Sequence, residues 1–404
     1  MNNYKEQLTC KLCYSINLTL IGDLGETPLA NEYVNNTETK QEYYPLQLML
    51  CEKCGNVQIR HTINPDIIFD EYVYVTGSSP GLVKHFQNYA DTIQNQIPKE
   101  SLIVEIGSND GTLLMMLQNY GHSVVGIEPG NIPSKISLNR GIFTIKEYFT
   151  SESAMDVLNT HGKADLVIAN NVMAHIENIN DVVDGIKILL EENGLFTMEI
   201  QYLRDVIEKK LIDTNYHEHR FIHSIKSLAS FFSNKDMKIE KVERINTHGG
   251  SIRLYVRNSR GIHGDSIIGM ISEEKTIKLH ERETYDKLFI DAKITGAELR
   301  GYIRAMKDEN KKIFGYGAPA KMTTLVHFLD VPKVEGVFED NPDKIGKYTP
   351  GQHVPIVSSK EIHNLNPDII IVFAWNEKDA IIKKLKDINY KGKILIPMPS
   401  LYIL

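Results

Sequence analysis

The segment Glu105-Ile-Gly-Ser-Asn-Asp-Gly111 begins at the end of one apolar run, residues 101–106, and leads into a second, residues 112–119. The first run has the length of a buried strand and the second has helical spacing, so the glycines are expected to form the turn between them. Val124-Val-Gly-Ile-Glu128 follows as a second strand that ends in an acid. This order predicts a Rossmann-like α/β domain that holds a nucleoside cofactor at the turn.

The composition of the turn separates two kinds of cofactor. A dinucleotide site would have the pattern GxGxxG, but Asn109 occupies the middle glycine position. The spacing of Glu105, Gly107 and Gly111 instead resembles that of class I methyltransferases, which bind S-adenosylmethionine. The resemblance implies that the methionyl part lies against Gly107 and that Glu128 accepts hydrogen bonds from the ribose hydroxyls. A nicotinamide cofactor is the alternative.

Two further apolar runs, residues 164–169 and 194–200, extend the same sheet. Asn170 and Asn171 follow the first run directly, at the strand end where open α/β sheets bind ligands. His175 suits a structural role as well as a functional one. The residues that we expect to bind the cofactor are Glu105, Gly107, Ser108, Asn109, Asp110, Glu128, Asn170 and Asn171.

Composition limits the class of protein. The 404 residues are enough for two or three domains, and the net charge of −7 provides no general attraction to nucleic acid or to anionic membranes. The first residues carry no basic segment followed by an apolar run, and the chain has no run of eighteen apolar residues. We therefore expect a cytoplasmic protein without nucleic-acid or membrane partners. No segment indicates an oligomer interface, which is compatible with a monomer.

All four cysteines lie in two CxxC pairs, Cys10-Lys-Leu-Cys13 and Cys51-Glu-Lys-Cys54. In a reducing compartment two such pairs predict four thiolates on one zinc ion. Four thiolates leave no open coordination position, so this zinc is expected to be structural. A redox pair or four free thiols is the alternative. Residues 46–50 are expected to form a strand of a small β-rich module that leads into the second pair.

The stretch Tyr216-His217-Glu218-His219 places two imidazoles, a carboxylate and a phenol in four residues. Such side chains are poor core material because they need polar partners when buried. The cluster therefore indicates a catalytic site. The alternative is a loop whose polar residues cap a neighbouring helix, with Ser224 or His217 as the cap.

Five motifs follow one another along the chain: the CxxC pairs, Tyr72-Val-Tyr74, the glycine-rich turn, the segment from Asp213 to His219, and Thr247-His-Gly-Gly-Ser-Ile-Arg253. This order resembles that of the sugar 3-C-methyltransferases of deoxysugar biosynthesis over nearly the whole chain. The resemblance implies a nucleotide-linked 4-keto-6-deoxy sugar as substrate, methylated on the carbon beside the ketone. It also implies S-adenosylmethionine and a structural zinc as cofactors.

Methylation beside a ketone needs a base for the carbon-bound proton and a donor for the oxygen on which enolate charge develops. The resemblance assigns His219 as the general base and Tyr216 as the group that polarises the ketone, although these two roles could be exchanged. Glu218 would orient the base or a sugar hydroxyl, and His217 would be structural. Tyr74 and Tyr72 are expected near the sugar, although alternating aromatic residues also suit a half-buried strand.

The C-terminal part is predicted to form a second Rossmann-like sheet, with strands near residues 311–315, 333–338, 367–373 and 393–397 and a helix at 321–329. The resemblance implies that this domain holds the nucleotide at the turn before the helix, where small residues allow close approach. Those small residues could equally serve helix–strand packing. We expect substrate contacts from His248, Gly249, Ser251, Arg253, Gly317, Ala318, Ala320, Lys321, Asp340, Asn341, Lys344 and Tyr348.

The expected domains are a zinc-binding module at residues 1–75, a methyltransferase domain at 76–260, and a helical linker with a nucleotide-sugar-binding domain at 261–404. Charged runs in the linker, such as Glu273-Glu-Lys275, are expected to be solvated helix faces. Two other functions stay open. One is an O- or N-methyltransferase for another small acceptor, and the other is a zinc-ribbon module that binds RNA or a protein.

Overall fold

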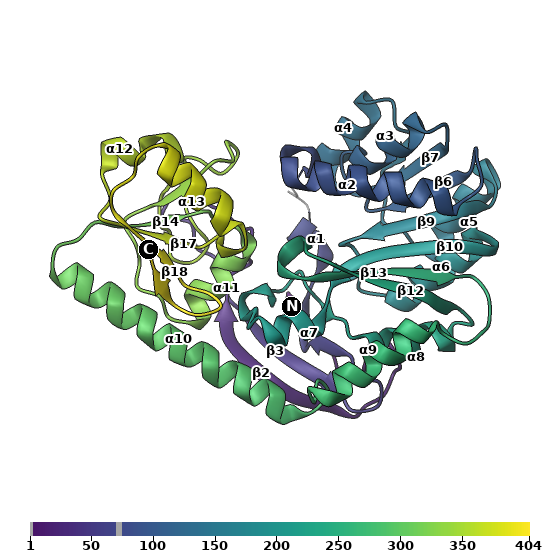
Figure 1. The fold of residues 1–404 in the computed structure, drawn as a ribbon, viewed down its shortest axis with the longest axis horizontal. Helices are drawn as coiled ribbons and strands as arrows, with labels where there is room; N and C mark the ends of the chain where they lie inside the picture. Colours follow the sequence, from purple (N-terminus) through teal and green to yellow (C-terminus); the bar gives the residue numbers. More distant parts are fainter. Residues whose placement is uncertain (1–2, 70–74) are drawn as a thin grey trace.

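The computed structural model describes residues 3–69 and 75–404, apart from the side chains of residues 66, 69 and 248. Two α/β units stand side by side, and the strands β2 (Leu18–Thr27) and β3 (Tyr44–Cys51) of the N-terminal module lie below and between them (Figure 1). The long helix α10 (Arg282–Asp308) runs along the C-terminal unit. The α/β fold with an N-terminal β-rich module is therefore confirmed.

The first α/β unit contains a seven-stranded sheet in the order β12-β13-β10-β9-β6-β7-β8. Strands β8, β7, β6, β9 and β10 run parallel to one another, whereas β13 is antiparallel to both β10 and β12. The parallel part of this sheet agrees with the Rossmann-like methyltransferase domain expected from the sequence, and the reversed strand β13 was not predicted. Its strands are β6 (Leu102–Ile106), β7 (Ser123–Ile127), β8 (Thr144–Ile145), β9 (Ala164–Asn170), β10 (Leu190–Gln201), β12 (Lys238–Ile245) and β13 (Ser251–Arg257).

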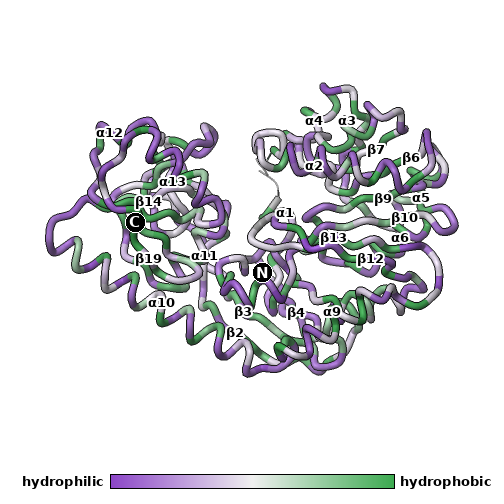
Figure 2. The backbone as a smooth tube through the Cα atoms, in the orientation of Figure 1, coloured by the Kyte–Doolittle hydropathy of each residue, from purple (hydrophilic) through white to green (hydrophobic). Residues whose placement is uncertain are grey.

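Helices cover both faces of this sheet, as right-handed crossovers between parallel strands require. The expected helix at residues 112–119 is α3 with the same bounds. The apolar strands and polar outer loops of this unit are visible in Figure 2. The other helical elements are η1 (Thr76–Ser78), α2 (Pro80–Ile93), η2 (Gln94–Gln96), α4 (Asn131–Asn139), α5 (Ser151–His161), α6 (Ile179–Leu189), α7 (Leu203–Glu208), η3 (Ile212–Thr214), α8 (Ile225–Asn234) and η4 (Thr247–Gly249).

The N-terminal module is built on an antiparallel sheet in the order β11-β4-β3-β2. Strand β11 (Phe221–Ile222) follows Tyr216-His217-Glu218-His219 after one residue, so this sheet connects the module to the stretch that the sequence indicates as catalytic. The predicted strand at residues 46–50 lies within β3. The remaining elements are β4 (Val57–Ile59), the pair β1 (Tyr4–Glu6) and β5 (His61–Ile63), and α1 (Pro65–Phe69).

The C-terminal unit has a six-stranded sheet in the order β16-β15-β14-β17-β18-β19, parallel except for the last strand. Its four predicted strands are all present. The elements are β14 (Ile313–Tyr316), α11 (Ala320–Phe328), β15 (Val337–Glu339), β16 (Ile356–Ser358), η5 (Ser359–Glu361), α12 (Ile362–Leu365), β17 (Ile369–Val372), η6 (Trp375–Glu377), α13 (Lys378–Asp387), β18 (Lys393–Ile396) and β19 (Tyr402–Ile403).

One apolar core joins the N-terminal sheet to the C-terminal unit. Leu46 and Leu48 of β3, Phe289 of α10 and Leu325 of α11 belong to the same buried cluster. Gly22 of β2 lies so close to α10 that a Cβ atom there would be 2.1 Å from the ring of Phe289. The N-terminal module therefore shares a core with the C-terminal unit and is not an independently packed domain.

The linker prediction needs one correction. Residues 264–310 are helical, as expected, in α9 (Asp265–Thr276) and α10, but Glu274 is fully buried and is not part of a solvated face. Its carboxylate accepts hydrogen bonds from the Tyr202 hydroxyl and from the backbone N–H groups of Ile225 and Lys226. These N–H groups lie in the first turn of α8, where a carboxylate is stabilised by the helix dipole. Charge alone did not reveal this tertiary contact.

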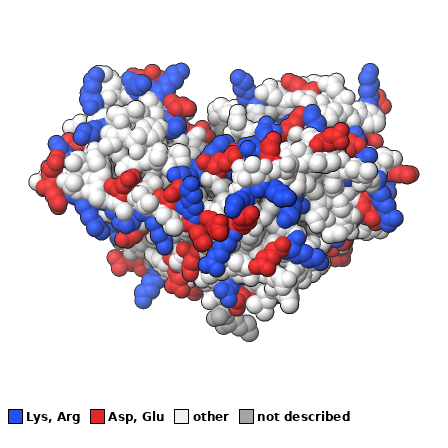
Figure 3. All heavy atoms as spheres, turned by 60° about the horizontal axis from the view of Figure 1, so that its bottom comes forward, with Lys and Arg blue, Asp and Glu red and all other residues white. Residues whose placement is uncertain are grey.

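Among the described residues, none of the helices combines the length and the apolar character needed to span a bilayer. The face of the molecule drawn in Figure 3 shows basic and acidic side chains interspersed. On that face the two signs largely alternate, so it does not offer a continuous basic surface.

Candidate active site

The four cysteine sulfurs of the N-terminal module converge on one point. All lie within 4.8 Å of one another, and the Sγ atoms of Cys10 and Cys54, like those of Cys13 and Cys51, are 3.6 Å apart. Four thiolates at Zn–S distances of about 2.3 Å stand at similar separations around a tetrahedral zinc, so the donor set fits that ion. The second CxxC turn ends at Gly55, which has a left-handed φ of 79°. The predicted zinc ligands are thus brought together.

The glycine-rich turn follows β6 at the carboxyl ends of the parallel strands, the place where open α/β sheets hold ligands in a crevice. Gly107 has a φ of 64°, and a Cβ atom there would lie 2.4 Å from Val172. Among the described residues, Oε2 of Glu105, Oγ of Ser108 and both amide atoms of Asn170 are buried without a hydrogen-bond partner. Buried polar atoms of this kind need partners, so the crevice fits a polar ligand.

The charge of this crevice also favours a cationic ligand. Burial raises the pKa of Glu105 well above its usual range, and the nearby carboxylates Asp110, Glu128 and Glu199 raise it further. S-adenosylmethionine carries a sulfonium and an ammonium group, and both would relieve this repulsion between carboxylates. The residues present therefore fit this cofactor.

Glu128 stands just after β7, as the sequence predicted. Its two carboxylate oxygens accept the backbone N–H groups of Asn109 at 2.9 Å and of Gly130 at 2.7 Å. Burial raises the pKa of Glu128, and these two hydrogen bonds act against that shift. The carboxylate is thus fixed at the end of β7, with lone pairs left over for further hydrogen bonds.

Asn109 and Asp110 have a different contact pattern. The Asn109 side chain accepts the N–H of Thr76, and the Asp110 carboxylate accepts the N–H of Gly77 while pairing with Arg140 at 2.9 Å. These side chains therefore hold the segment before α2 against the turn. Asn171 has a left-handed φ of 57° and donates its N–H to the carbonyl of Glu199, which shapes the strand end beside Asn170.

Tyr216 and His219 form a direct pair. The Tyr216 hydroxyl lies 2.8 Å from Nε2 of His219, and Nδ1 of His219 lies 2.8 Å from the carbonyl oxygen of Thr214. A carbonyl can only accept, so Nδ1 carries a proton, and when the ring is neutral the lone pair is on Nε2. His175 stands on the other side, with its ring centroid 5.0 Å from that of His219.

The two middle residues of the stretch face other elements. Glu218 is buried and accepts a hydrogen bond of 2.6 Å from the Asn31 side chain. Burial raises the pKa of Glu218 to about 7, against the opposing effects of Asn31 and of the Lys344 charge. His217 is buried against the ring of Tyr44, and burial lowers its pKa to about 4. Its neutral ring therefore packs on the N-terminal sheet.

Tyr72 and Tyr74 lie outside the described residues, and so does the side chain of His248. Ser224 caps α8 through a capping box with Ser227, so the capping role considered for this segment exists beside the Tyr216–His219 pair and does not replace it.

The THGGSIR segment places its polar side chains inside the methyltransferase domain. Arg253 is buried, pairs with Glu199, and lies 3.6 Å from the centroid of the Tyr89 ring. Ser251 donates its hydroxyl to the carbonyl of Thr247. Gly249 instead faces the C-terminal unit, because a Cβ atom there would lie within 4 Å of Leu211 and of Trp375.

In the C-terminal unit, the turn at residues 316–320 is reached by the N-terminal module. Tyr33 and Lys344 both donate hydrogen bonds to the carbonyl of Ala318, at 2.5 and 2.8 Å. Burial lowers the pKa of Lys344, while the charges of Glu339 and Glu218 act in the opposite direction. Gly317 has a φ of 83° and lies against Ala374, so close packing alone requires glycine there.

The other predicted substrate residues of this unit are distributed around that turn. Ala320 begins α11, and Lys321 lies over the ring of Trp375. Asp340 pairs with Lys384, and Asn341 accepts the N–H of Asp343. The backbone of Tyr348 pairs with that of Val34 in the N-terminal module and is thereby removed from the turn.

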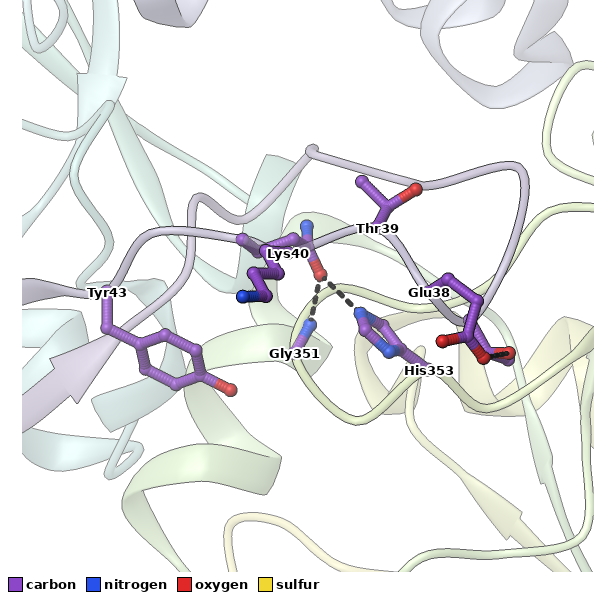
Figure 4. Close-up of a pocket in the computed structure, with 8 residues that line it drawn as sticks. Glu38, Thr39, Lys40, Tyr43, Gly351 and His353 are labelled. Carbon is purple, nitrogen blue, oxygen red and sulfur yellow. Dashed lines mark hydrogen bonds between the residues drawn. The ribbon is translucent and has the colours of Figure 1, made fainter.

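A cavity of about 330 Å³ lies between residues 37–43 and residues 351–353 (Figure 4). Gln41 bridges its two walls, since Oε1 accepts the N–H of Gly351 at 2.7 Å and lies 3.1 Å from Nε2 of His353. None of the predicted site residues lines this cavity. It is therefore separate from the catalytic stretch.

Sequence reasoning missed several residues that the fold brings to this region. Asn31 and Tyr33 lie in a loop without any motif, so no local signal could have found them. Glu199 is an acid inside an apolar strand, a pattern that could have been noticed. Trp375 is the single tryptophan of the chain, and its indole N–H donates to Asp213 at 2.6 Å. The presence of only one tryptophan in the chain was the signal that could have drawn attention to this residue.

Three family models match the chain in succession. They are described as "Putative zinc binding domain" at residues 10–69, "Methyltransferase domain" at residues 84–242 and "C-methyltransferase C-terminal domain" at residues 246–399. The C-methyltransferase NovU of Streptomyces niveus is 29% identical over 400 residues, which cover 97% of this chain and 95% of that protein.

Two solved structures match over less than half of the chain. Magnesium protoporphyrin IX methyltransferase from Synechocystis PCC 6803 with bound S-adenosylmethionine has 14% identity and a TM-score of 0.33, and the match covers 45% of this chain and 81% of that one. The YcgJ protein from a Bacillus species has 10% identity and a TM-score of 0.35, with 44% and 100% covered.

The sheet order, the crevice and the cysteine cluster define an S-adenosylmethionine-dependent methyltransferase with a zinc-binding module. The three matched domains and the similarity to NovU support an S-adenosylmethionine-dependent C-methyltransferase. The expectation of a methyl donor in place of a nicotinamide cofactor is therefore confirmed, as is the expectation of zinc in place of disulfides or a redox pair.

Proposed function

We propose that this enzyme methylates carbon 3 of a nucleotide-linked 4-keto-6-deoxy sugar through an enolate. The observation that carries the proposal is the Tyr216–His219 pair, which supplies a basic nitrogen and a phenol at one point. The match to the C-methyltransferase NovU covers nearly the whole length of that protein, which favours carbon as the acceptor atom. An O- or N-methyltransferase would not need a base strong enough for a carbon acid.

His219 is the base in this proposal. The proton on Nδ1 is held by the Thr214 carbonyl, so the lone pair on Nε2 takes the proton from carbon 3 of the sugar. The Tyr216 hydroxyl, which donates to Nε2 in the resting site, is then free to donate to the ketone oxygen as negative charge develops there. The negative charge on the enolate oxygen is then stabilised by the Tyr216 hydroxyl, and the proton from carbon 3 is held on Nε2 of His219.

The bound S-adenosylmethionine supplies the electrophilic methyl group. The protein's contribution to this step is to hold the acceptor carbon in line with that group and to exclude water. Glu105, Gly107 and Asn170 are proposed to hold the cofactor, and their position at the carboxyl ends of β6 and β9 supports this proposal. Tyr72, Tyr74 and the THGGSIR segment are proposed to complete the sugar site.

The nucleotide is proposed to bind at the start of α11. The helix begins after Pro319 without a side-chain cap, so its first N–H groups are available to a pyrophosphate. Lys321 and Lys344 provide positive charge near this turn, and Glu339 holds the turn through the Ala318 N–H. Asp340 and Asn341 follow β15, on the side where a ribose would lie in a Rossmann-like domain.

Two measurements test the function. Methyl transfer from labelled S-adenosylmethionine is measured with thymidine-, guanosine- and cytidine-linked 4-keto-6-deoxy sugars, and at least one is expected to accept the label on carbon. A substrate deuterated at carbon 3 should lose its deuterium before or during transfer. Retention of deuterium in a methylated product would instead support O- or N-methylation, and no transfer to any of the sugars would contradict the substrate class.

A further inference from the structure

The carbonyl that orients His219 belongs to Thr214, and the C-terminal unit holds the residues on both sides of it. Asp213 accepts the indole N–H of Trp375 at 2.6 Å, and the carbonyl of Asn215 accepts the hydroxyl of Thr324 at 3.0 Å. Trp375 lies in η6 and Thr324 in α11, both in the C-terminal sheet domain. The short element η3 is thereby fixed from outside its own domain.

The first of these contacts is fully enclosed. Asp213 is 0% exposed and Trp375 is 6% exposed, so the hydrogen bond between them is shielded from water. A buried carboxylate is costly unless it has partners. Burial raises the pKa of Asp213, while the Lys321 charge and the Trp375 hydrogen bond act against that shift. Two groups of the C-terminal unit therefore stabilise this acid beside the catalytic stretch.

The second contact connects the catalytic turn to the start of α11. Thr324 is 1% exposed and lies four residues, about one helical turn, after Ala320. Ala320 is the first residue of the helix whose N-terminus is proposed to bind the pyrophosphate. A shift of α11 would therefore reach Asn215 through the Thr324 hydroxyl alone, and from Asn215 it would pass along the backbone to the Thr214 carbonyl.

We infer that the C-terminal domain positions the catalytic base, with Trp375 and Thr324 as positioning residues that hold the Thr214 carbonyl against Nδ1 of His219. These two contacts, of Trp375 with Asp213 and of Thr324 with Asn215, form a clamp that keeps the proton on Nδ1 and the lone pair on Nε2, toward Tyr216. Because it concerns the base, this inference rests on the proposed function. It also gives the C-terminal domain a role in the chemical step beyond holding the nucleotide.

The test compares two neighbouring threonines of α11. Thr324→Val removes the hydroxyl that reaches Asn215, and Thr323→Val removes an equally buried hydroxyl that donates to the carbonyl of Ala30 instead. We expect kcat to fall about 10- to 100-fold further in T324V than in T323V, since a small misplacement of a catalytic group has effects of this size. Cofactor affinity should be equal in the two variants, and Thr324→Ser should restore kcat.

The tautomer of His219 gives a second readout that needs no turnover. In ¹⁵N-labelled protein, the imidazole signals that His219→Asn removes should show Nδ1 protonated in the wild type and in T323V. T324V and Trp375→Phe should both shift these signals toward a mixture of tautomers, and their effects on kcat should be less than multiplicative in the double variant, because both act on η3.

The outcomes separate this inference from the proposed function. If H219N turns over at nearly the wild-type rate, the assignment of the base fails, whereas the tautomer measurement still decides whether the clamp exists. If H219N is inactive but T324V matches T323V in both kcat and tautomer, the clamp is overturned and the proposed function stands.

Discussion

The Asn31 side chain donates a hydrogen bond of 2.6 Å to the carboxylate of Glu218, although 187 residues separate them along the chain. Asn31 belongs to the N-terminal module, and Glu218 directly precedes His219, the proposed base, three residues before the strand β11 that joins this module's sheet. The zinc-binding module thus contacts the proposed catalytic stretch directly, in addition to supporting the fold.

This contact has a pH-dependent consequence. Folding raises the pKa of Glu218 from 4.5 to about 7, so between these values the folded protein binds the proton more tightly than the unfolded chain. The free energy of unfolding should therefore decrease as pH rises through this interval, by at most about 3 kcal/mol. Glu218→Gln should remove this decrease, as measured by denaturant unfolding at pH 5 and pH 8.

The control for that measurement is Glu191→Gln, which changes the same functional group at an exposed position. E191Q should keep the wild-type difference in stability between pH 5 and pH 8. An E218Q protein with the same difference as the wild type would show that Glu218 ionises normally and that its burial is not maintained in solution.

Replacement of His219 by Asn should lower kcat at least about 100-fold, because general-base catalysis contributes factors of this order. The affinity for S-adenosylmethionine should change little, since His219 is hydrogen-bonded to Tyr216 and to the Thr214 carbonyl, which are not among the residues expected to bind the cofactor. Steady-state kinetics and calorimetry measure the two quantities. A fall in cofactor affinity with an unchanged kcat would contradict the role of His219 as base and would indicate that His219 binds the cofactor.

Gly107→Ala should weaken S-adenosylmethionine binding by at least about tenfold. The new methyl group would lie 2.4 Å from Val172, and the backbone has a φ of 64° that residues with a Cβ rarely adopt. Gly121→Ala is a matched control, because Gly121 also has a positive φ of 89° but a Cβ atom there would have no neighbour within 4 Å. Equal losses of affinity in both variants would indicate backbone strain and not crowding of the crevice.

Removal of zinc should destabilise more than the N-terminal module. Cys10, Cys51 and Cys54 belong to the same buried cluster as the methyltransferase strands, so loss of the metal should lower the melting temperature of the whole protein by several degrees. Metal analysis before and after chelation, with thermal unfolding, checks this. Ser15→Ala in the same knuckle should retain one zinc per chain. An unchanged transition after complete zinc loss would contradict the expectation.

Local sequence determined the α/β units and several elements of the site. The turn from Glu105 to Gly111 is specified by residues that are adjacent in sequence, because backbone conformation at Gly107 and Gly111 depends on their lack of a side chain. The four cysteines likewise define a metal site through their chemistry alone, since two CxxC pairs provide all four ligands. In both cases the relevant spacing is short, and the resemblance to a known family added the order of the motifs.

Only the tertiary structure decided which side chains surround the catalytic stretch. Asn31 reaches Glu218 and Trp375 reaches Asp213 from other domains, and these contacts depend on how the N-terminal sheet and the C-terminal unit share one apolar core. The burial of Glu274 and the raised pKa of Glu218 arise in the same way. Turns and metal ligands are found from short motifs in the sequence, whereas contacts between distant segments leave no local pattern. The sequence therefore determined the short-range features, and the tertiary structure decided the long-range ones.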